Sequence, residues 1–100
     1  MYKLIIKPYA ETDAIEAAKC YNDKREGLGN EFLLVLDAKM NSLKRNPYHF
    51  QNVHKNIKRA LTERFPYEIF FTIEDNVVYV LAILHTGRNP KIWTKRKNKA

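Results

Sequence analysis

The sequence predicts an α+β domain in the order β-α-α-β-β-β, with an antiparallel sheet packed against an antiparallel helical hairpin. Residues 64–90 predict a long β-hairpin, because Val, Ile, Phe and Tyr dominate both arms. Residues 9–25 and 30–45 place apolar side chains three and four positions apart, which is typical of amphipathic helices. The length of 100 residues allows one small domain.

The first half of the chain predicts an edge strand followed by two helices. Residues 2–7 form a short strand-like run that mixes apolar residues with two lysines and ends at Pro8, so we expect a strand at or near the edge of the sheet. Gly27-Leu28-Gly29 breaks the helical pattern, and Asn46-Pro47 ends the second helix, because the residue before a proline avoids the α region. Two helices joined by so short a turn pack antiparallel, and together they can cover the apolar face of the sheet.

Residues 47–63 predict a loop and then a strand. The loop, residues 47–55, carries two aromatic side chains and two histidines, and residues 56–63 lead into the hairpin as a strand. His49 and His54 have no Cys or carboxylate partner nearby in the sequence, which favours surface or packing roles over metal ligation. We therefore expect neither a metal nor a cofactor.

The turn of the hairpin sets which side chains share a face. Asp75-Asn76 suits a two-residue turn, since both residue types tolerate positive φ, and Glu74 then pairs with Val77. The predicted core face holds Tyr67, Ile69, Phe71, Ile73, Val78, Val80, Ala82 and Leu84. The opposite face holds Glu68, Phe70, Thr72, Glu74, Val77, Tyr79, Leu81, Ile83 and His85. Arg64 points to this second face if the strand stays extended through Pro66, so we expect Arg64 and His85 to meet near the open end of the hairpin.

Positive charge is unevenly distributed along a chain whose formal net charge is +7. Most acidic residues lie in the first 37 positions, with none between Asp37 and Glu63 and none after Asp75. This asymmetry suggests an anionic partner, such as nucleic acid, the ribosome or an acidic protein, although solubility alone is the alternative. The residues that we expect to contact such a partner are Lys58, Arg59, Lys91, Lys95, Arg96 and Lys97.

The composition also indicates where the protein works. No apolar run approaches the roughly 20 residues of a membrane span, and the first residues are too short for a signal peptide. We therefore expect a cytoplasmic protein with no membrane partner. Cys20 is the only cysteine, so an internal disulfide is excluded and a small core residue is expected. The domain is expected to cover residues 1–93, followed by a basic, flexible tail over residues 94–100.

Several short pieces of sequence occur together in the order of a known family. They are Gly27-Leu28-Gly29 with Phe32, Asn46-Pro47, Arg64-Phe65-Pro66-Tyr67, and His85-Thr86-Gly87-Arg88-Asn89-Pro90 with Trp93. In this order and at this length, the chain resembles the RelE/ParE superfamily, the bacterial toxins of type II toxin–antitoxin modules, often labelled plasmid stabilisation proteins. The resemblance covers nearly the whole chain and is to the ParE-type branch. It implies a cognate antitoxin as partner, whose acidic residues would meet the basic surface.

The resemblance implies two alternative mechanisms. RelE-like members are similar to ribosome-dependent mRNA endonucleases, which need a general base, a general acid and cations for the phosphorane charge. In this sequence those roles would fall to His85, Arg64 and Arg88, together with Lys58 or Arg59. ParE-like members instead resemble inhibitors of DNA gyrase and perform no chemistry of their own.

Two departures from the RelE-like pattern favour the gyrase-type branch. Glu68 stands where active nucleases tend to carry an Arg, and its charge would repel the scissile phosphate. The last tyrosine is Tyr79, whereas the nucleases often use a tyrosine near the C-terminus, where this chain offers Trp93.

The apolar part of the second hairpin face is expected to be covered by the antitoxin, by the second helix or by a second copy. Its residues are Phe70, Tyr79, Leu81 and Ile83.

Overall fold

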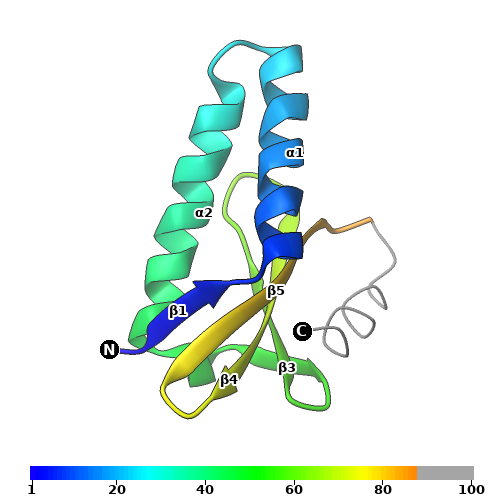
Figure 1. The fold of residues 1–100 in the computed structure, drawn as a ribbon. Helices are drawn as coiled ribbons and strands as arrows, with labels where there is room; N and C mark the ends of the chain where they lie inside the picture. Colours follow the sequence, from blue (N-terminus) through cyan, green and yellow to red (C-terminus); the bar gives the residue numbers. More distant parts are fainter. Residues whose placement is uncertain (88–100) are drawn as a thin grey trace.

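The computed structural model describes residues 1–87, which form two helices packed on a five-stranded sheet (Figure 1). The elements are β1 (Lys3–Ile6), α1 (Pro8–Lys24), α2 (Leu28–Arg45), a 3-10 turn (Pro47–His49), β2 (Gln51–His54), β3 (Ile57–Leu61), β4 (Tyr67–Glu74) and β5 (Val77–His85). The predicted α+β class and element order are confirmed, with β2 added inside the predicted loop. Because β2 carries mostly exposed polar side chains, it lacks the apolar pattern that marks the other strands.

The strand order in the sheet is β1-β5-β4-β3-β2, so β1 lies at an edge as expected. The pairs from β2 to β5 are antiparallel, but β1 runs parallel to β5, with Leu4 opposite Val78 and Ile6 opposite Val80. The prediction of a purely antiparallel sheet is therefore wrong for β1. Since β1 and β5 are far apart in the sequence, no tight turn forces them to run in opposite directions.

The β4–β5 hairpin begins in the predicted register and then leaves it. Glu74 pairs with Val77, and the same register holds as far as Phe71 and Val80. Phe70 then pairs with Ala82, so Leu81 is an extra residue in β5, a β-bulge. Every residue of β5 beyond the bulge consequently faces the side opposite to the predicted one.

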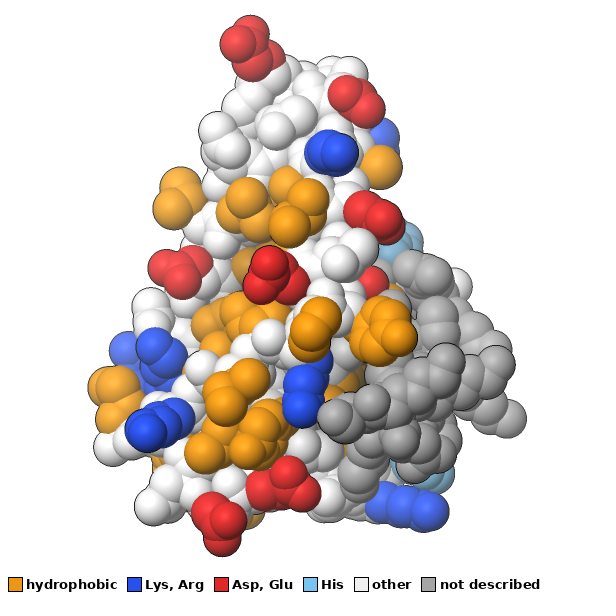
Figure 2. Space-filling model, viewed as in Figure 1, with side chains coloured by type: hydrophobic (Ala, Val, Ile, Leu, Met, Phe, Trp, Pro, Cys, Tyr) orange, Lys and Arg blue, Asp and Glu red, His pale blue; other side chains and the backbone are white. Residues whose placement is uncertain are grey.

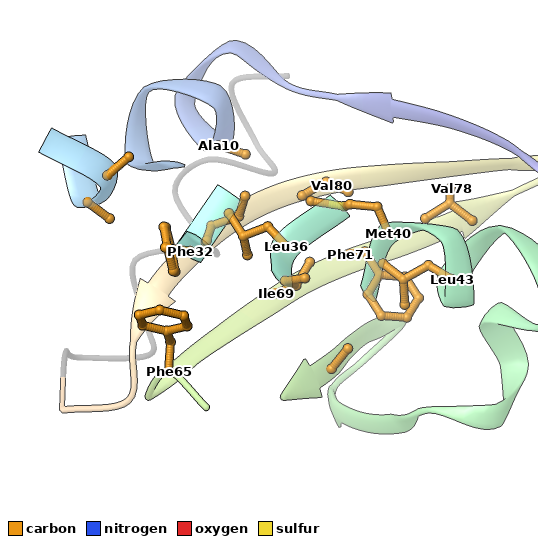
Figure 3. Packing of buried hydrophobic residues seen from close by; sticks show 14 residues of the cluster. Ala10, Phe32, Leu36, Met40, Leu43, Phe65, Ile69, Phe71, Val78 and Val80 are labelled. Carbon is orange, nitrogen blue, oxygen red and sulfur yellow. The ribbon is translucent and has the colours of Figure 1, made fainter. Parts of the chain in front are cut away.

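The main core lies between the helices and one face of the sheet. Figure 3 shows Phe32, Leu36, Met40 and Leu43 of α2 directed toward the strands, and their side chains are almost fully buried. From the sheet this core takes Ile69, Phe71, Val78, Val80 and Ile83. Because of the bulge, Ile83 replaces the predicted Ala82 and Leu84 on this face.

A smaller apolar cluster lies on the other face of the sheet. It consists of Ile57, Phe70, Leu81, Ala82 and Leu84, with Val53 and Tyr79 partly buried beside them. Phe70 and Leu81 are only 1% and 3% exposed, so at these two positions the expected cover by the antitoxin, the second helix or a second copy is not needed. The bulge places Leu81 and Ala82 together on this side, where they pack against the side chains of β3 and β4.

The turn between the helices depends on two glycines. Gly27 has φ +86°, in the left-handed region that favours glycine, and its carbonyl accepts the Glu31 amide at the start of α2. Gly29 lies against α1, where its amide donates to Oδ1 of Asn22 at 2.8 Å. This contact explains why the helices pack so closely at their joined end.

Neither α1 nor α2 is long and apolar enough to cross a membrane.

Candidate functional site

A shallow pocket of about 210 Å³ lies where the end of β5 meets α1. It is lined by Asp13, Glu16, Ala17, Cys20, Tyr67, Ile83 and His85. The bulge in β5 places the side chain of His85 on the face of the sheet that the helices cover. The ring of His85 lies 5.5 Å from the ring of Tyr67. The prediction that His85 lies on the face away from the core is therefore wrong.

Two carboxylates of α1 give this pocket an acidic wall. Asp13 and Glu16 are three positions apart, so they project from the same side of the helix. Oδ2 of Asp13 accepts a hydrogen bond from the Ile83 amide at 3.0 Å, which fixes α1 against β5. A neighbourhood of carboxylates repels a nucleic-acid phosphate, so the surroundings of His85 do not suit phosphate binding.

His85 is exposed, and its Nδ1 accepts a hydrogen bond from the Gly87 amide at 3.0 Å. When Nδ1 accepts, the proton of a neutral imidazole resides on Nε2. The free nitrogen in this arrangement is a hydrogen-bond donor rather than a base. Taking a proton from a ribose 2′-hydroxyl would require the other tautomer, and this hydrogen bond opposes that change.

Arg64 lies in a separate cluster, where its guanidinium contacts α2. Its Nη2 is 2.8 Å from Oε1 of Glu31, and Nη2 of Arg25 is 3.1 Å from Oε2 of the same carboxylate. Hydrogen bonds first from Arg64 and then from Arg25 lower the pKa of Glu31. Arg64 also has φ +70°, so the chain does not stay extended into β4 as predicted. The predicted meeting of Arg64 with His85 is consequently replaced by an ion pair with Glu31.

The two basic residues predicted on β3 are held by neighbouring groups of the protein. Lys58 Nζ donates to the Phe50 carbonyl at 2.9 Å and lies over the Tyr48 ring. Arg59 pairs with Glu68 at 3.2 Å, across the β3–β4 ladder, and its other nitrogen contacts Gln51. These cations therefore have roles in the fold, and Glu68 is neutralised by Arg59 instead of standing alone.

Other predicted contact residues lie outside residues 1–87. They are the contact residues Lys91, Lys95, Arg96 and Lys97 and the candidate catalytic residue Arg88. Trp93 and the predicted tail over residues 94–100 also lie outside the described residues. Within the described part of the chain, no group of three or more His, Cys, Asp or Glu side chains could hold a metal ion.

The sequence reasoning did not identify Asp13, Glu16 and Cys20 as neighbours of His85. Cys20 was expected in the core but is exposed. Ala10, Ala17 and Ala18 occupy the buried side of α1, which leaves Cys20 at the pocket. Helical periodicity alone places Asp13, Glu16 and Cys20 on one side of α1, but only the bulge in β5 brings His85 to them.

The comparisons with known proteins agree with this architecture. Residues 4–90 match the family described as the ParE toxin of the type II toxin-antitoxin system, parDE. The chain belongs to the ParE toxin family. The match spans most of the chain and includes both the helical hairpin and the strands that carry the residues described above.

The fold of this ParE family member is also found in a solved structure described as the chromosomal ParDE TA system from P. aeruginosa. The two chains superpose with a TM-score of 0.77 at 13% sequence identity, over 85% of this chain and 96% of that one. The sequence matches none of the curated proteins to which it was compared.

Proposed function

We propose that this protein is a growth-inhibiting toxin that acts by binding DNA gyrase and is neutralised by a cognate antitoxin. Membership of the ParE toxin family supports a toxin–antitoxin role. The single observation that favours binding over catalysis is the separation of the candidate catalytic groups. Arg64 pairs with Glu31 on α2, Arg59 pairs with Glu68 in the sheet, and His85 lies beside Asp13 and Glu16.

RNA cleavage by the 2′-hydroxyl needs a base, an acid and a cation within reach of one phosphate. Among residues 1–87 the candidate cations are instead compensated one by one by carboxylates or a carbonyl. The free nitrogen of His85 is a donor, and the nearest charged groups that line its pocket are negative. These features suit a protein that inhibits by binding.

The first experiment maps the 5′ ends of cellular mRNA after brief induction of the wild type and of His85→Ala. We expect growth arrest with intact messages, and in a companion assay we expect purified protein to inhibit DNA supercoiling by gyrase. New in-frame cuts that disappear in His85→Ala would establish the RelE-like endonuclease alternative. Intact messages together with unimpaired supercoiling would exclude both targets.

A second experiment tests the basic residues beyond the described part of the chain. Reversing the charges of Lys95, Arg96 and Lys97 should weaken binding to the target, and added salt should weaken it further, if these cations meet an anionic surface. A matched variant reverses Lys3, Lys19 and Lys24, which are exposed residues of β1 and α1. Equal effects of the two triple variants would show that net charge alone governs binding.

A further inference from the structure

An exposed tyrosine lies just beyond the end of α2, in the 3-10 turn Pro47–His49. Tyr48 is 62% exposed, although its aromatic side chain is large. The ring of Tyr2 lies edge-on to the Tyr48 ring, with the ring centroids 6.3 Å apart, and Nζ of Lys58 lies 5.7 Å from the Tyr48 centroid. These two neighbours hold the ring in place while more than half of the residue stays open to solvent.

Both neighbours of Tyr48 are themselves fixed by hydrogen bonds to the main chain. Nζ of Lys58 donates to the Phe50 carbonyl at 2.9 Å, and the Tyr2 amide donates to the Lys44 carbonyl at 3.0 Å. The second hydrogen bond joins the start of the chain to the last turn of α2. A ligand that packs on Tyr48 therefore meets a ring that is already restrained, which reduces the entropy lost on binding.

The chain around Tyr48 is basic. Residues 38–62 contain no Asp or Glu, and Lys44 and Arg45 end α2 shortly before Tyr48. In Figure 2, Lys and Arg side chains lie at the lower left, where α2 ends beside β1, with no acidic side chain among them. Among residues 1–87, neither Lys44 nor Arg45 takes part in an ion pair, and Arg45 contacts only the neutral hydroxyl of Ser42. Their charges are therefore available to an anionic ligand.

An exposed aromatic ring beside uncompensated cations is the arrangement with which proteins bind single-stranded nucleic acid. A base stacks on the ring, and the cations attract the phosphates on either side of that base. A duplex is a poorer ligand for such a ring, because its bases are already stacked on one another. An acidic peptide would use the cations but would leave the ring of Tyr48 without a partner.

We propose that Lys44, Arg45, Tyr48 and Lys58, which we call the Tyr48 platform, bind single-stranded nucleic acid. A base stacks on Tyr48, adjacent phosphates lie at Lys44 and Arg45, and Lys58 positions the ring. Ring faces and phosphates are common to DNA and RNA, so the platform accepts both and reads no particular sequence. It shares no residue with the pocket at His85, and it goes beyond the proposed function because it needs neither gyrase nor an antitoxin.

The test measures fluorescence anisotropy of a labelled oligothymidylate of about 12 nucleotides with the full-length protein. The matched probes are an abasic strand of the same length, the corresponding duplex and an oligouridylate. We expect the thymidylate strand to bind about tenfold or more tightly than the abasic strand, because only the former offers bases to stack. The deoxyribose and ribose strands distinguish DNA from RNA, and this dependence on bases in either one supports the proposal.

Variants of the platform separate stacking from charge. Tyr48→Leu should bind the thymidylate strand about tenfold more weakly, whereas Tyr48→Phe should retain the wild-type affinity. Tyr9→Leu is the matched control, since Tyr9 is 51% exposed but lies on α1.

Lys44→Gln/Arg45→Gln should weaken binding of the thymidylate and abasic strands alike and should make both less sensitive to salt. Lys19→Gln/Lys24→Gln removes the same charge from exposed positions of α1 and should change binding less. Equal effects of the two double variants would show that net charge alone attracts the strand, and this would contradict the role of Lys44 and Arg45.

Other results would overturn the proposal as a whole. Equal affinity of the wild type for the thymidylate and abasic strands would reduce it to binding of any polyanion, and tighter binding of the duplex would exclude a single-stranded ligand. Equal losses in Tyr48→Leu and Tyr9→Leu would remove Tyr48 from the contact. Melting temperatures verify that the variants are folded.

A second measurement on the wild type avoids any failure of Tyr48→Leu to fold. Photochemical crosslinking to a bromouracil-substituted strand should modify Tyr48, and crosslinks confined to residues outside the Tyr48 platform would contradict the proposal. Both measurements use the protein without gyrase. A protein that leaves supercoiling unimpaired but binds the strand through Tyr48 would therefore overturn the proposed function and support this inference.

Discussion

The amide of Ile83 donates a hydrogen bond to Oδ2 of Asp13, at 3.0 Å, and so joins α1 to β5 beyond the point where β1 ends. The last residue of β1 pairs with Val80, and Lys7 donates to the Val80 carbonyl before the chain turns into α1. Beyond Val80, β5 has no strand beside it on the β1 side, and the hydrogen-bond acceptor for the Ile83 amide comes from α1 instead. A single carboxylate therefore fixes α1 over the end of the sheet that carries His85.

Removal of this carboxylate should destabilise the fold. Asp13→Ala leaves the amide of Ile83, a buried residue, without its acceptor, at a cost of about 1–3 kcal/mol in the free energy of unfolding. Asp13→Asn keeps an acceptor oxygen and should cost less. Urea unfolding measures both, and Glu16→Ala on the same side of α1 is the control. Equal stability of Asp13→Ala and the control would show that the hydrogen bond contributes nothing.

Replacing Gly29 or Gly27 by alanine should lower the stability of the fold, but for different reasons. A Cβ on Gly29 would meet the Ala18 carbonyl oxygen and lie 2.7 Å from Cγ of Asn22, so the helices must separate. We expect Gly29→Ala to cost more than about 2 kcal/mol in the free energy of unfolding. Gly27→Ala meets nothing within 4 Å but must keep φ +86°, which costs about 1–2 kcal/mol. The melting temperatures of the two variants check this order, and a lower melting temperature for Gly27→Ala than for Gly29→Ala would contradict it.

The cluster of Arg64, Glu31 and Arg25 should make stability depend on pH in the acid range. The hydrogen bonds from both arginines lower the pKa of Glu31 from 4.5 in the folded state. The folded state thus favours the ionised form, so the contribution is complete above pH 4.5 and is lost as the pH falls through the lowered pKa. Because the site is exposed, the contribution is small.

Glu31→Gln checks this dependence, because a side chain that does not titrate removes it. Urea midpoints at pH 7 and pH 3 should differ less in Glu31→Gln than in the wild type. Glu26→Gln, in the connection between α1 and α2, is a control for the loss of one exposed carboxylate. If Glu31→Gln kept the full difference between the two pH values, the ion pairs with Arg64 and Arg25 would be irrelevant to acid stability.

Arg59 should be needed for stability through its pair with Glu68. The carboxylate side chain of Glu68 is only 12% exposed, so Arg59→Ala leaves a largely buried charge uncompensated, at a cost of about 1–3 kcal/mol. Arg59→Ala/Glu68→Ala should recover part of this loss. A double-mutant cycle in urea measures the coupling, and additive effects would contradict it. Lost activity in Arg59→Ala alone would consequently not identify a target contact.

Much of the fold could be predicted because its signals are local. The spacing of apolar residues marks α1 and α2, Gly27 and Asn46 mark their ends, and Asp75-Asn76 marks the hairpin turn. Four residue pairs next to that turn have the predicted register. Strand β2 was missed because its residues are short of apolar side chains, and its pairing depends on β3 rather than on its own pattern.

The candidate site was harder to predict, since its geometry depends on one extra residue. Nothing in the sequence of β5 separates Leu81 from its apolar neighbours, yet the bulge there moves His85 to the helical side and Leu84 to the other. Arg64 was assigned to an extended strand, but a left-handed residue directs its side chain to Glu31.

The sequence by itself determined the α+β class, the helix limits, the turn of the hairpin and the family, because each depends on residues close together in the chain or on a pattern along it. Tertiary structure alone decided the direction of β1, the partners of Arg59, Arg64 and His85, and the contacts that hold Tyr48. These features result from packing between segments that are distant in sequence. The close fit of α1 against β5 selects one strand register and one set of contacts from several that the local sequence allows.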